Sequence, residues 1–239
     1  MHLPFWLVTA VLAPVLLYQG RRTRRITPRL PDGSGTPGGQ YGEGTPERRI
    51  LVLGESTAAS VGVATHDQGL ASQLARLIHQ HSASTTAWHT FGVNGIRLQA
   101  LNGALVKAEL PPADLVLLSM GVNDATGFTS RNRFRQQLIA LRQMLAARYS
   151  APLVLLGVPP MHSFTALPSP LRQVMGWRAR QLDDVYARLA HERTGDFIHL
   201  RYPLVTDPDL LASDGYHPGL KGYRHIAEAL MQEGIDLLH

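Results

Sequence analysis

Five short apolar runs of β character alternate with segments of helical periodicity from residue 49 onward, and this alternation constrains the fold most. The runs lie at residues 49–53, 85–91, 114–119, 152–158 and 197–200. Helices are predicted at residues 70–78, 98–110, 134–145, 170–194 and 220–238. Strands that are apolar throughout and are separated by helices belong to a parallel sheet with both faces covered. The sequence therefore predicts an α/β fold, a three-layer α/β/α sandwich around a five-stranded parallel sheet.

The length of 239 residues suits one α/β domain, which we expect to occupy residues 48–239. Residues 21–47 read as a linker, first basic and then rich in Gly and Pro. Within this linker, residues 31–46 contain six Gly and three Pro. Such a stretch buries too little side-chain surface to offset the backbone entropy that ordering costs, so we expect a flexible tether. The chain has no cysteine, which excludes disulfides, thiolate zinc sites and a cysteine nucleophile.

Residues 1–20 contain an uncharged apolar segment, 3–18, which is followed by arginines at positions 21, 22, 24 and 25. Sixteen residues are short for a transmembrane helix, which needs ~20. A secretory signal would carry its basic residues before the apolar run, not after it. We therefore expect membrane attachment, either as a span or, given Pro4 and Pro14, as a helix in the interface. Packing of an apolar helix on the domain is the alternative. The arginines favour a cytoplasmic location for the domain.

The basic residues are concentrated at the N-terminus. Residues 1–49 hold seven arginines against three acidic residues, a net charge of +4, and the rest of the chain carries 16 basic against 15 acidic residues. The body is therefore nearly neutral and offers no basic stripe for a phosphate backbone, so nucleic acid is not an expected partner.

Chemically versatile residues follow the first three predicted strands and precede the last helix. Ser56 follows the first strand, the segment 92–95 the second and Asn123 the third, while Asp214 and His217 lie just before the last helix. In an open parallel sheet, ligands bind outside the carboxyl ends of the strands. We therefore expect these segments to converge on one edge of the sheet.

The residue types fit acyl transfer. A serine hydroxyl needs an imidazole to take its proton, and the imidazole needs a carboxylate to fix its tautomer. Donors must also face the oxygen that becomes negative. Ser56 N–H, a glycine N–H and the Asn123 amide can supply them. Ser56 is followed by Thr57 and Ala58, so the G-x-S-x-G elbow of the α/β-hydrolases is missing.

Four blocks follow one another along the chain: Gly54-Glu55-Ser56, Phe91-Gly92-Val93-Asn94-Gly95, Gly121-Val122-Asn123-Asp124 and Asp214-Gly215-Tyr216-His217. In these blocks the chain resembles the SGNH, or GDSL-type, serine hydrolases. The similarity runs from about residue 49 to 235, and four blocks in order are far more specific than any one of them. The departure is Glu55, which stands where the family has aspartate.

The resemblance implies a flavodoxin-like sheet of strand order 2-1-3-4-5 and hydrolysis of esters or thioesters without a cofactor. It assigns Ser56 as nucleophile, His217 as base and Asp214 as the orienting acid. The implied oxyanion donors are the N–H groups of Ser56 and Gly95, with Gly92 as the alternative to Gly95, and the side chain of Asn123.

Other residues attract weaker interpretations. Asp124 is expected to support the loop rather than the chemistry. Met161 and Phe164, after the double proline at 159–160, can line an acyl pocket or pack in the core. The histidines lack a consistent ligand spacing, so no metal site is expected.

The expected activity is that of a serine esterase acting on a small-molecule or lipid ester. Proximity to a membrane favours a lipid-derived ester such as a lysophospholipid, with short-chain esters and thioesters as other substrates. Two alternatives use the same crevice: an acyltransferase, in which an alcohol replaces water, and a non-catalytic domain that binds an acyl group or a partner.

Overall fold

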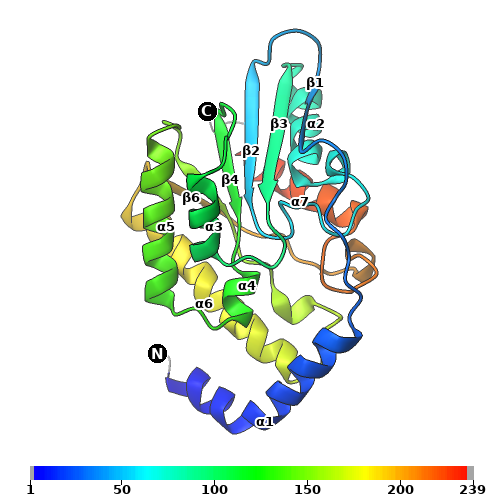
Figure 1. Ribbon diagram of the computed structural model, residues 1–239, viewed down its shortest axis with the longest axis vertical. Coiled ribbons are helices and arrows are strands. Elements are labelled where there is room, and N and C mark those ends of the chain that lie inside the picture. Colours follow the sequence, from blue (N-terminus) through cyan, green and yellow to red (C-terminus); the bar gives the residue numbers. More distant parts are fainter. Residues whose placement is uncertain (1–2, 236–239) are drawn as a thin grey trace.

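The computed structural model describes residues 3–235, which are built around one six-stranded sheet (Figure 1). Its strands are β1 (Gly38–Tyr41), β2 (Arg48–Gly54), β3 (Thr86–Gly92), β4 (Leu115–Ser119), β5 (Leu153–Leu156) and β6 (Phe197–Leu200). They are arranged in the order β1-β3-β2-β4-β5-β6. All pairs are parallel except the antiparallel pair β1–β3. The five predicted strands and their order are thus confirmed, and β1 is an addition.

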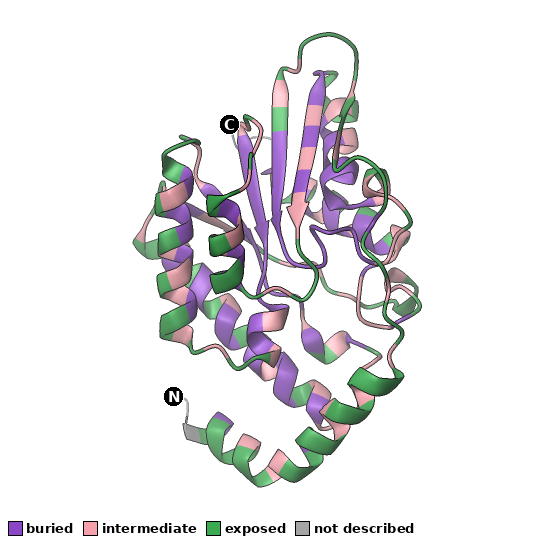
Figure 2. Ribbon diagram, in the orientation of Figure 1, coloured by how far each residue is buried: buried purple, intermediate pink, exposed green. Residues whose placement is uncertain are grey.

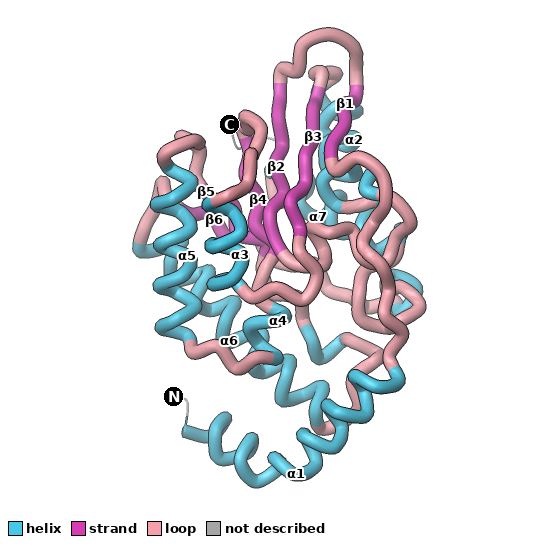
Figure 3. The backbone as a smooth tube through the Cα atoms, in the orientation of Figure 1, coloured by secondary structure: helices cyan, strands magenta, loops and turns pink. Residues whose placement is uncertain are grey.

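Strand β1 lies within the segment for which the sequence predicts a flexible tether. It pairs along the free edge of β3, and Gly39 lies against the indole ring of Trp88, where a Cβ would be only 3.0 Å from the nearest ring atom. Tyr41 also exchanges a hydrogen bond of 2.8 Å with Ser72. The prediction is wrong for this part of the segment, because an edge strand offers backbone partners to a chain that has few side chains to bury. Figure 3 shows the remaining loop running along the side of the molecule before it reaches β1.

Helices cover both faces of the sheet, which gives the predicted three layers. On one face lie α2 (Leu70–Ser82) and α7 (Leu220–Gln232), and on the other lie α3 (Leu98–Val106), α5 (Arg131–Ala146) and α6 (Leu171–Glu192). Short elements are η1 (His66–Gln68), α4 (Val122–Thr126), η2 (Met161–Ser163) and η3 (Pro208–Leu210). The helix predicted at 220–238 ends at Gln232 in the structure, and the predicted residues 236–238 lie outside the described residues.

The strands alternate their side chains between two apolar cores. In β2, Leu51 and Leu53 pack toward α3, α5 and α6, whereas Ile50 and Val52 pack toward α2 and α7. All four side chains are buried, and Figure 2 shows most of β2 buried while the flanking helices are partly exposed. Burial on both faces explains why these strands read as continuous apolar runs in the sequence.

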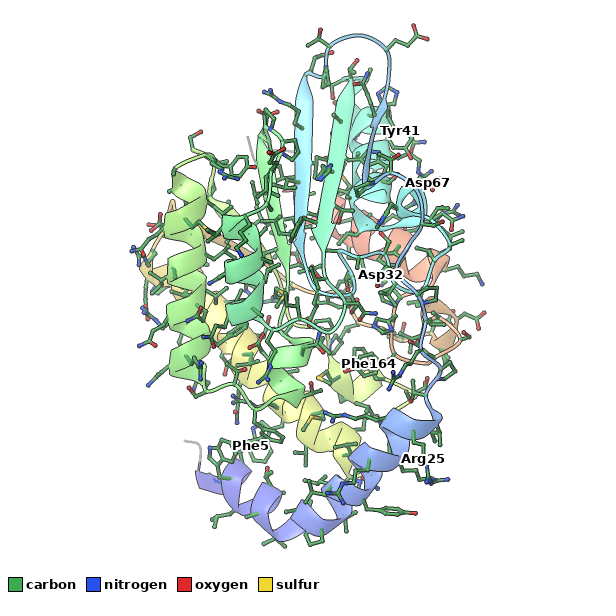
Figure 4. All side chains as sticks on the ribbon, in the orientation of Figure 1. Phe5, Arg25, Asp32, Tyr41, Asp67 and Phe164 are labelled. Carbon is green, nitrogen blue, oxygen red and sulfur yellow. The ribbon has the colours of Figure 1, made fainter. Side chains whose placement is uncertain are left out.

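Helix α1 (Leu3–Ile26) lies across the end of the molecule toward which β2 and β3 run (Figure 1). It packs on α6: Phe5 is fully buried, with its ring centroid 5.2 Å from that of Trp177. Gln19 donates to Ser169 O at 2.7 Å and accepts from Leu171 N at 3.1 Å. Figure 4 places Phe5 and Arg25 near the two ends of this helix. Among residues 3–235, no helix has both the length and the apolarity that crossing a membrane requires.

Candidate active site

The carboxyl ends of the three central strands lie side by side. Gly54 at the end of β2 pairs with Gly92 of β3 and with Ser119 of β4. The chain segments that leave these ends carry Ser56 and Asn123 and the glycine loop at 92–95. The ends of β2, β3 and β4, from which three of the expected segments leave, therefore meet at one edge of the sheet.

Two glycines allow the turn after β2 to sit tightly against its neighbours. A Cβ on Gly54 would collide with the Ser119 carbonyl oxygen, and a Cβ on Gly92 would collide with the backbone of Ala58 and Ala59. The turn itself closes through a hydrogen bond of 3.0 Å from Ala59 N to Glu55 O. Ser56 is therefore held at a fixed position, with 8% of its surface exposed.

Asp214 and His217 form a close pair in the loop before α7. Asp214 Oδ2 lies 2.5 Å from His217 Nδ1. Asp214 Oδ1 accepts hydrogen bonds of 3.0 Å from the N–H groups of Tyr216 and His217. Burial acts to raise the pKa of Asp214, but the hydrogen bonds from His217 outweigh it, so the pKa lies below its ordinary value. Asp214 is thus ionised near neutral pH, and it holds the imidazole by Nδ1, leaving Nε2 for another partner.

Contacts at the start of α7 bring this loop to the turn that carries Ser56. Tyr223 Oη donates to Val61 O at 2.7 Å and lies 3.4 Å from Thr57 O. No hydrogen bond joins Ser56 and His217 among the described residues. Catalytic hydrogen bonds are often long or poorly aligned before substrate binds, so the arrangement is compatible with proton transfer between these two residues.

Two backbone N–H groups in the segments that leave β2 and β3 have no acceptor among the described residues. Within residues 3–235, neither Ser56 N–H nor Gly95 N–H donates a hydrogen bond. Gly95 is exposed and has φ = +78°, a left-handed conformation that favours glycine. Gly92, the alternative donor, instead packs against the turn after β2. The unpaired N–H groups and the Asn123 amide are suitable for meeting an oxyanion.

Glu55 has a role that the sequence did not reveal. Its buried carboxyl group accepts hydrogen bonds from Val122 N at 2.8 Å, from Asn123 N at 3.0 Å and from the Asn123 side chain. Burial is the main cause that raises the pKa of Glu55 to about 7; the three donors oppose it, and the charge of Asp124 adds to it. Glu55 thus fixes the orientation of the Asn123 amide and joins the nucleophile turn to α4.

The remaining predicted residues lie in the supporting structure. Asp124 is buried and accepts a hydrogen bond of 2.9 Å from Leu98 N, which agrees with a structural role. Met161 and Phe164 are buried in the core beside α6. The Phe164 ring centroid is 4.7 Å from that of Tyr216, and the Tyr216 ring is 5.3 Å from His217. Tyr216 therefore lies between Phe164 and His217, and nothing distinctive in the sequence pointed to this tyrosine. A pocket role for Met161 and Phe164 stays a prediction.

The geometry can be compared with that of known proteins. Similar solved structures include a lipase/acylhydrolase from Enterococcus faecalis, with 21% identity, a TM-score of 0.60, and coverage of 80% of this chain and 97% of that one. An acetyl xylan esterase from Geobacillus stearothermophilus has 17% identity and a TM-score of 0.58, with coverage of 79% and 94%. The esterase EstA from Pseudoalteromonas sp. has 18% identity and a TM-score of 0.55, with coverage of 78% and 96%.

These identities are low and show a common fold. Comparison with curated proteins finds no match. The profile of the GDSL-like lipase/acylhydrolase family matches residues 52–225, a stretch that contains Ser56, Asn123, Asp214 and His217. The chain therefore belongs to the GDSL-like lipase/acylhydrolase family.

Proposed function

We propose that this protein hydrolyses carboxylic esters through an acyl-enzyme on Ser56, with His217 as general base and Asp214 as the orienting acid. The observation that carries the proposal is the 2.5 Å contact between His217 Nδ1 and the buried Asp214 carboxylate, in a loop that Tyr223 of α7 links to the turn carrying Ser56. A buried carboxylate on Nδ1 selects the tautomer whose Nε2 can accept a proton.

In the proposed mechanism, Ser56 Oγ attacks the acyl carbon while His217 Nε2 takes its proton. The oxyanion accepts hydrogen bonds from the N–H groups of Ser56 and Gly95 and from the Asn123 amide. Asn123 has two amide hydrogens, and one of them is donated to Glu55, so the second remains for the substrate. Collapse of the intermediate expels the alcohol, which receives the proton from His217. Water then attacks the acyl-enzyme with His217 again as base, and the acid product leaves Ser56 free.

The first test compares the full chain with its Ser56→Ala variant on p-nitrophenyl esters of increasing acyl length. Ser213→Ala is the matched control, because Ser213 is an exposed serine beside Asp214. We expect turnover to vanish in Ser56→Ala alone, and Ser56 to react with a fluorophosphonate probe. A folded protein that neither turns over these esters nor takes the label would contradict the mechanism and favour a non-catalytic binding domain. Diversion of product from free acid to ester by an added alcohol would indicate an acyltransferase.

The proposed substrates are lipid-derived esters, such as lysophospholipids, presented at a membrane surface on which α1 lies. The outer side of α1 exposes a row of large apolar side chains: Trp6, Leu7, Val8, Val11, Val15, Leu17 and Tyr18. Exposed arginines follow at positions 21, 22, 24 and 25. An apolar helix face with arginines at one end suits the interface of a membrane that contains anionic lipids. Because α1 lies at the end of the molecule toward which β2 and β3 run, this attachment would bring the site close to the lipid.

Flotation with vesicles tests the attachment. The full chain is expected to float with vesicles of phosphatidylcholine and phosphatidylglycerol, and the Val11→Glu/Leu17→Glu variant is expected to remain in solution. Leu204→Glu serves as the control, because Leu204 is 69% exposed in a loop outside α1. Equal flotation of all three proteins, or flotation of none, would contradict docking through α1.

We also propose that the domain faces the cytoplasm, since the anionic cytoplasmic leaflet attracts clustered arginines. The chain has no cysteine, so Leu204→Cys introduces one exposed thiol. We expect an impermeant thiol reagent to label this variant only after the cells are lysed. Labelling in intact cells would contradict the assignment.

A further inference from the structure

A cavity separate from the Ser56–His217 region lies between α5, α6 and α1. Its volume is about 350 Å³, and its wall consists of the first turn of α5, one side of α6 and Trp6 of α1. Four of the side chains that line it are arginines: Arg131, Arg135, Arg178 and Arg188. Among the described lining residues Glu192 is the one acidic side chain, so four positive charges face one negative charge and the wall has a net charge of +3.

The single carboxylate is already engaged. Glu192 Oε2 lies 2.5 Å from Arg135 Nη2 in an exposed ion pair. Glu192 thus offers its charge mainly to Arg135, with Arg188 as a weaker electrostatic partner, and no ion pair is formed by the buried Arg178 among the described residues.

Arg178 shows this shortage most clearly, because only 2% of its surface is exposed. Its guanidinium donates to Gln181 Oε1 at 2.6 Å and to the Thr129 carbonyl, which are both neutral acceptors. Its Nε has no acceptor among the described residues. Burial, followed by the like charge of Arg131, lowers the pKa of Arg178, while Asp124 acts in the opposite direction. A buried cation whose hydrogen-bond acceptors are neutral is costly, and an anion arriving from outside would add to the compensation that Asp124 supplies.

The N-terminal end of α5 adds a second source of positive potential. Ser130, Arg131 and Asn132, which begin this 16-residue helix, all line the cavity. The Ser130 hydroxyl caps the helix by accepting from Arg133 N at 3.2 Å. The N–H groups of the first turn and the helix dipole favour an anion at this end.

We propose that this cavity binds an anion of the phosphate type, carried either by a lipid headgroup or by a soluble phosphate compound. Arginine guanidinium groups match the tetrahedral oxygens of phosphate and can bind them by two parallel hydrogen bonds. Trp6 belongs both to the cavity wall and to the exposed apolar side of α1, so a lipid held at α1 has its headgroup near the cavity. Anion binding requires neither the nucleophile nor turnover, so its failure and that of the proposed esterase activity are distinguishable.

The test measures binding of inorganic phosphate to the full chain by thermal unfolding at constant ionic strength, with chloride as the reference anion. The variant Arg131→Gln/Arg188→Gln removes two cations from the wall, and Arg180→Gln removes an exposed arginine of α6 that does not line the cavity. We expect phosphate to raise Tm of the native chain and the control, and roughly tenfold more phosphate to be needed for the same rise in the double variant.

A second arm uses vesicles of phosphatidylcholine with phosphatidic acid and vesicles of phosphatidylcholine alone. A headgroup site predicts binding to phosphatidic acid vesicles that the double variant loses and the Arg180→Gln control keeps. If free phosphate alone shows the arginine-dependent effect, the ligand is a soluble phosphate compound. If neither phosphate nor phosphatidic acid distinguishes the double variant from the control, the proposal is refuted. Single Arg188→Gln, at an exposed position, keeps the test valid if the double variant does not fold.

Discussion

Replacing Glu55 with glutamine removes a buried titratable carboxyl group and leaves the size of the side chain nearly unchanged. Burial raises the pKa of Glu55 from 4.5 to about 7, so the folded protein holds this proton more tightly than the unfolded chain does. The stabilising effect is complete below pH 4.5 and is lost as the pH rises through 7. Since a tenfold change in an equilibrium constant is about 1.4 kcal/mol, the loss for this one group amounts to about 3 kcal/mol. The Glu55→Gln protein does not lose this free energy of unfolding, because glutamine does not titrate.

Urea unfolding of both proteins between pH 4.5 and 8 measures this effect. In the difference in unfolding free energy between the two proteins, the contributions of the other titratable groups cancel. We expect Glu55→Gln to gain up to about 3 kcal/mol relative to the native protein as the pH rises across this range. Glu228→Gln, at an exposed position of α7, is the control for the loss of one carboxyl group. A flat difference for Glu55→Gln, or one that falls with pH, would refute the argument that burial outweighs the three N–H donors.

Three further changes test the scaffold of the site. Asp214→Asn removes the carboxylate that holds His217, and we expect kcat to fall by about 10³–10⁴-fold while circular dichroism shows an unchanged fold. Gly92→Ala places a methyl group in the backbone of the turn after β2, and we expect it to cost about 2 kcal/mol in thermal unfolding and more than tenfold in kcat/KM; Gly103→Ala, with open space around it on α3, should be neutral or stabilising by about 0.5–1 kcal/mol. Tyr223→Phe leaves a carbonyl of that turn unpaired, and we expect urea unfolding to show a loss of about 1–3 kcal/mol together with a lower kcat, so unchanged values would contradict its bracing role.

The parallel sheet was predictable because its strands are buried on both faces, and the sequence records that burial directly. Residues 50–53 and 115–118 are apolar without interruption, a pattern that few other folds require. Strand β1 was not predictable, because the sequence Gly-Gly-Gln-Tyr has no period. Its residues form a strand only because β3 presents a free edge beside them.

The candidate site divides in the same way. Asp214 and His217 are three residues apart, so one loop can bring them together, and local spacing suffices to predict the pair. The hydrogen-bond donors to the Glu55 carboxyl group, Val122 and Asn123 of α4, are 67 and 68 residues away in the sequence. The sequence Gly-Glu-Ser alone does not predict these bonds. Contacts between distant segments depend on how strands are ordered in the sheet, which no single stretch of sequence encodes.

The N-terminal helix marks the same boundary. The sequence by itself determined a long apolar segment followed by arginines, because apolarity and charge are properties of the residues alone. Only the tertiary structure decided which residues of that helix face the protein: Phe5 and Leu16 are buried, while Val11 and Leu17 are exposed. It likewise brought Trp6 to four arginines from α5 and α6. Sequence thus determines where the chain can bury surface, and packing in three dimensions determines which surfaces and charges remain to meet a ligand.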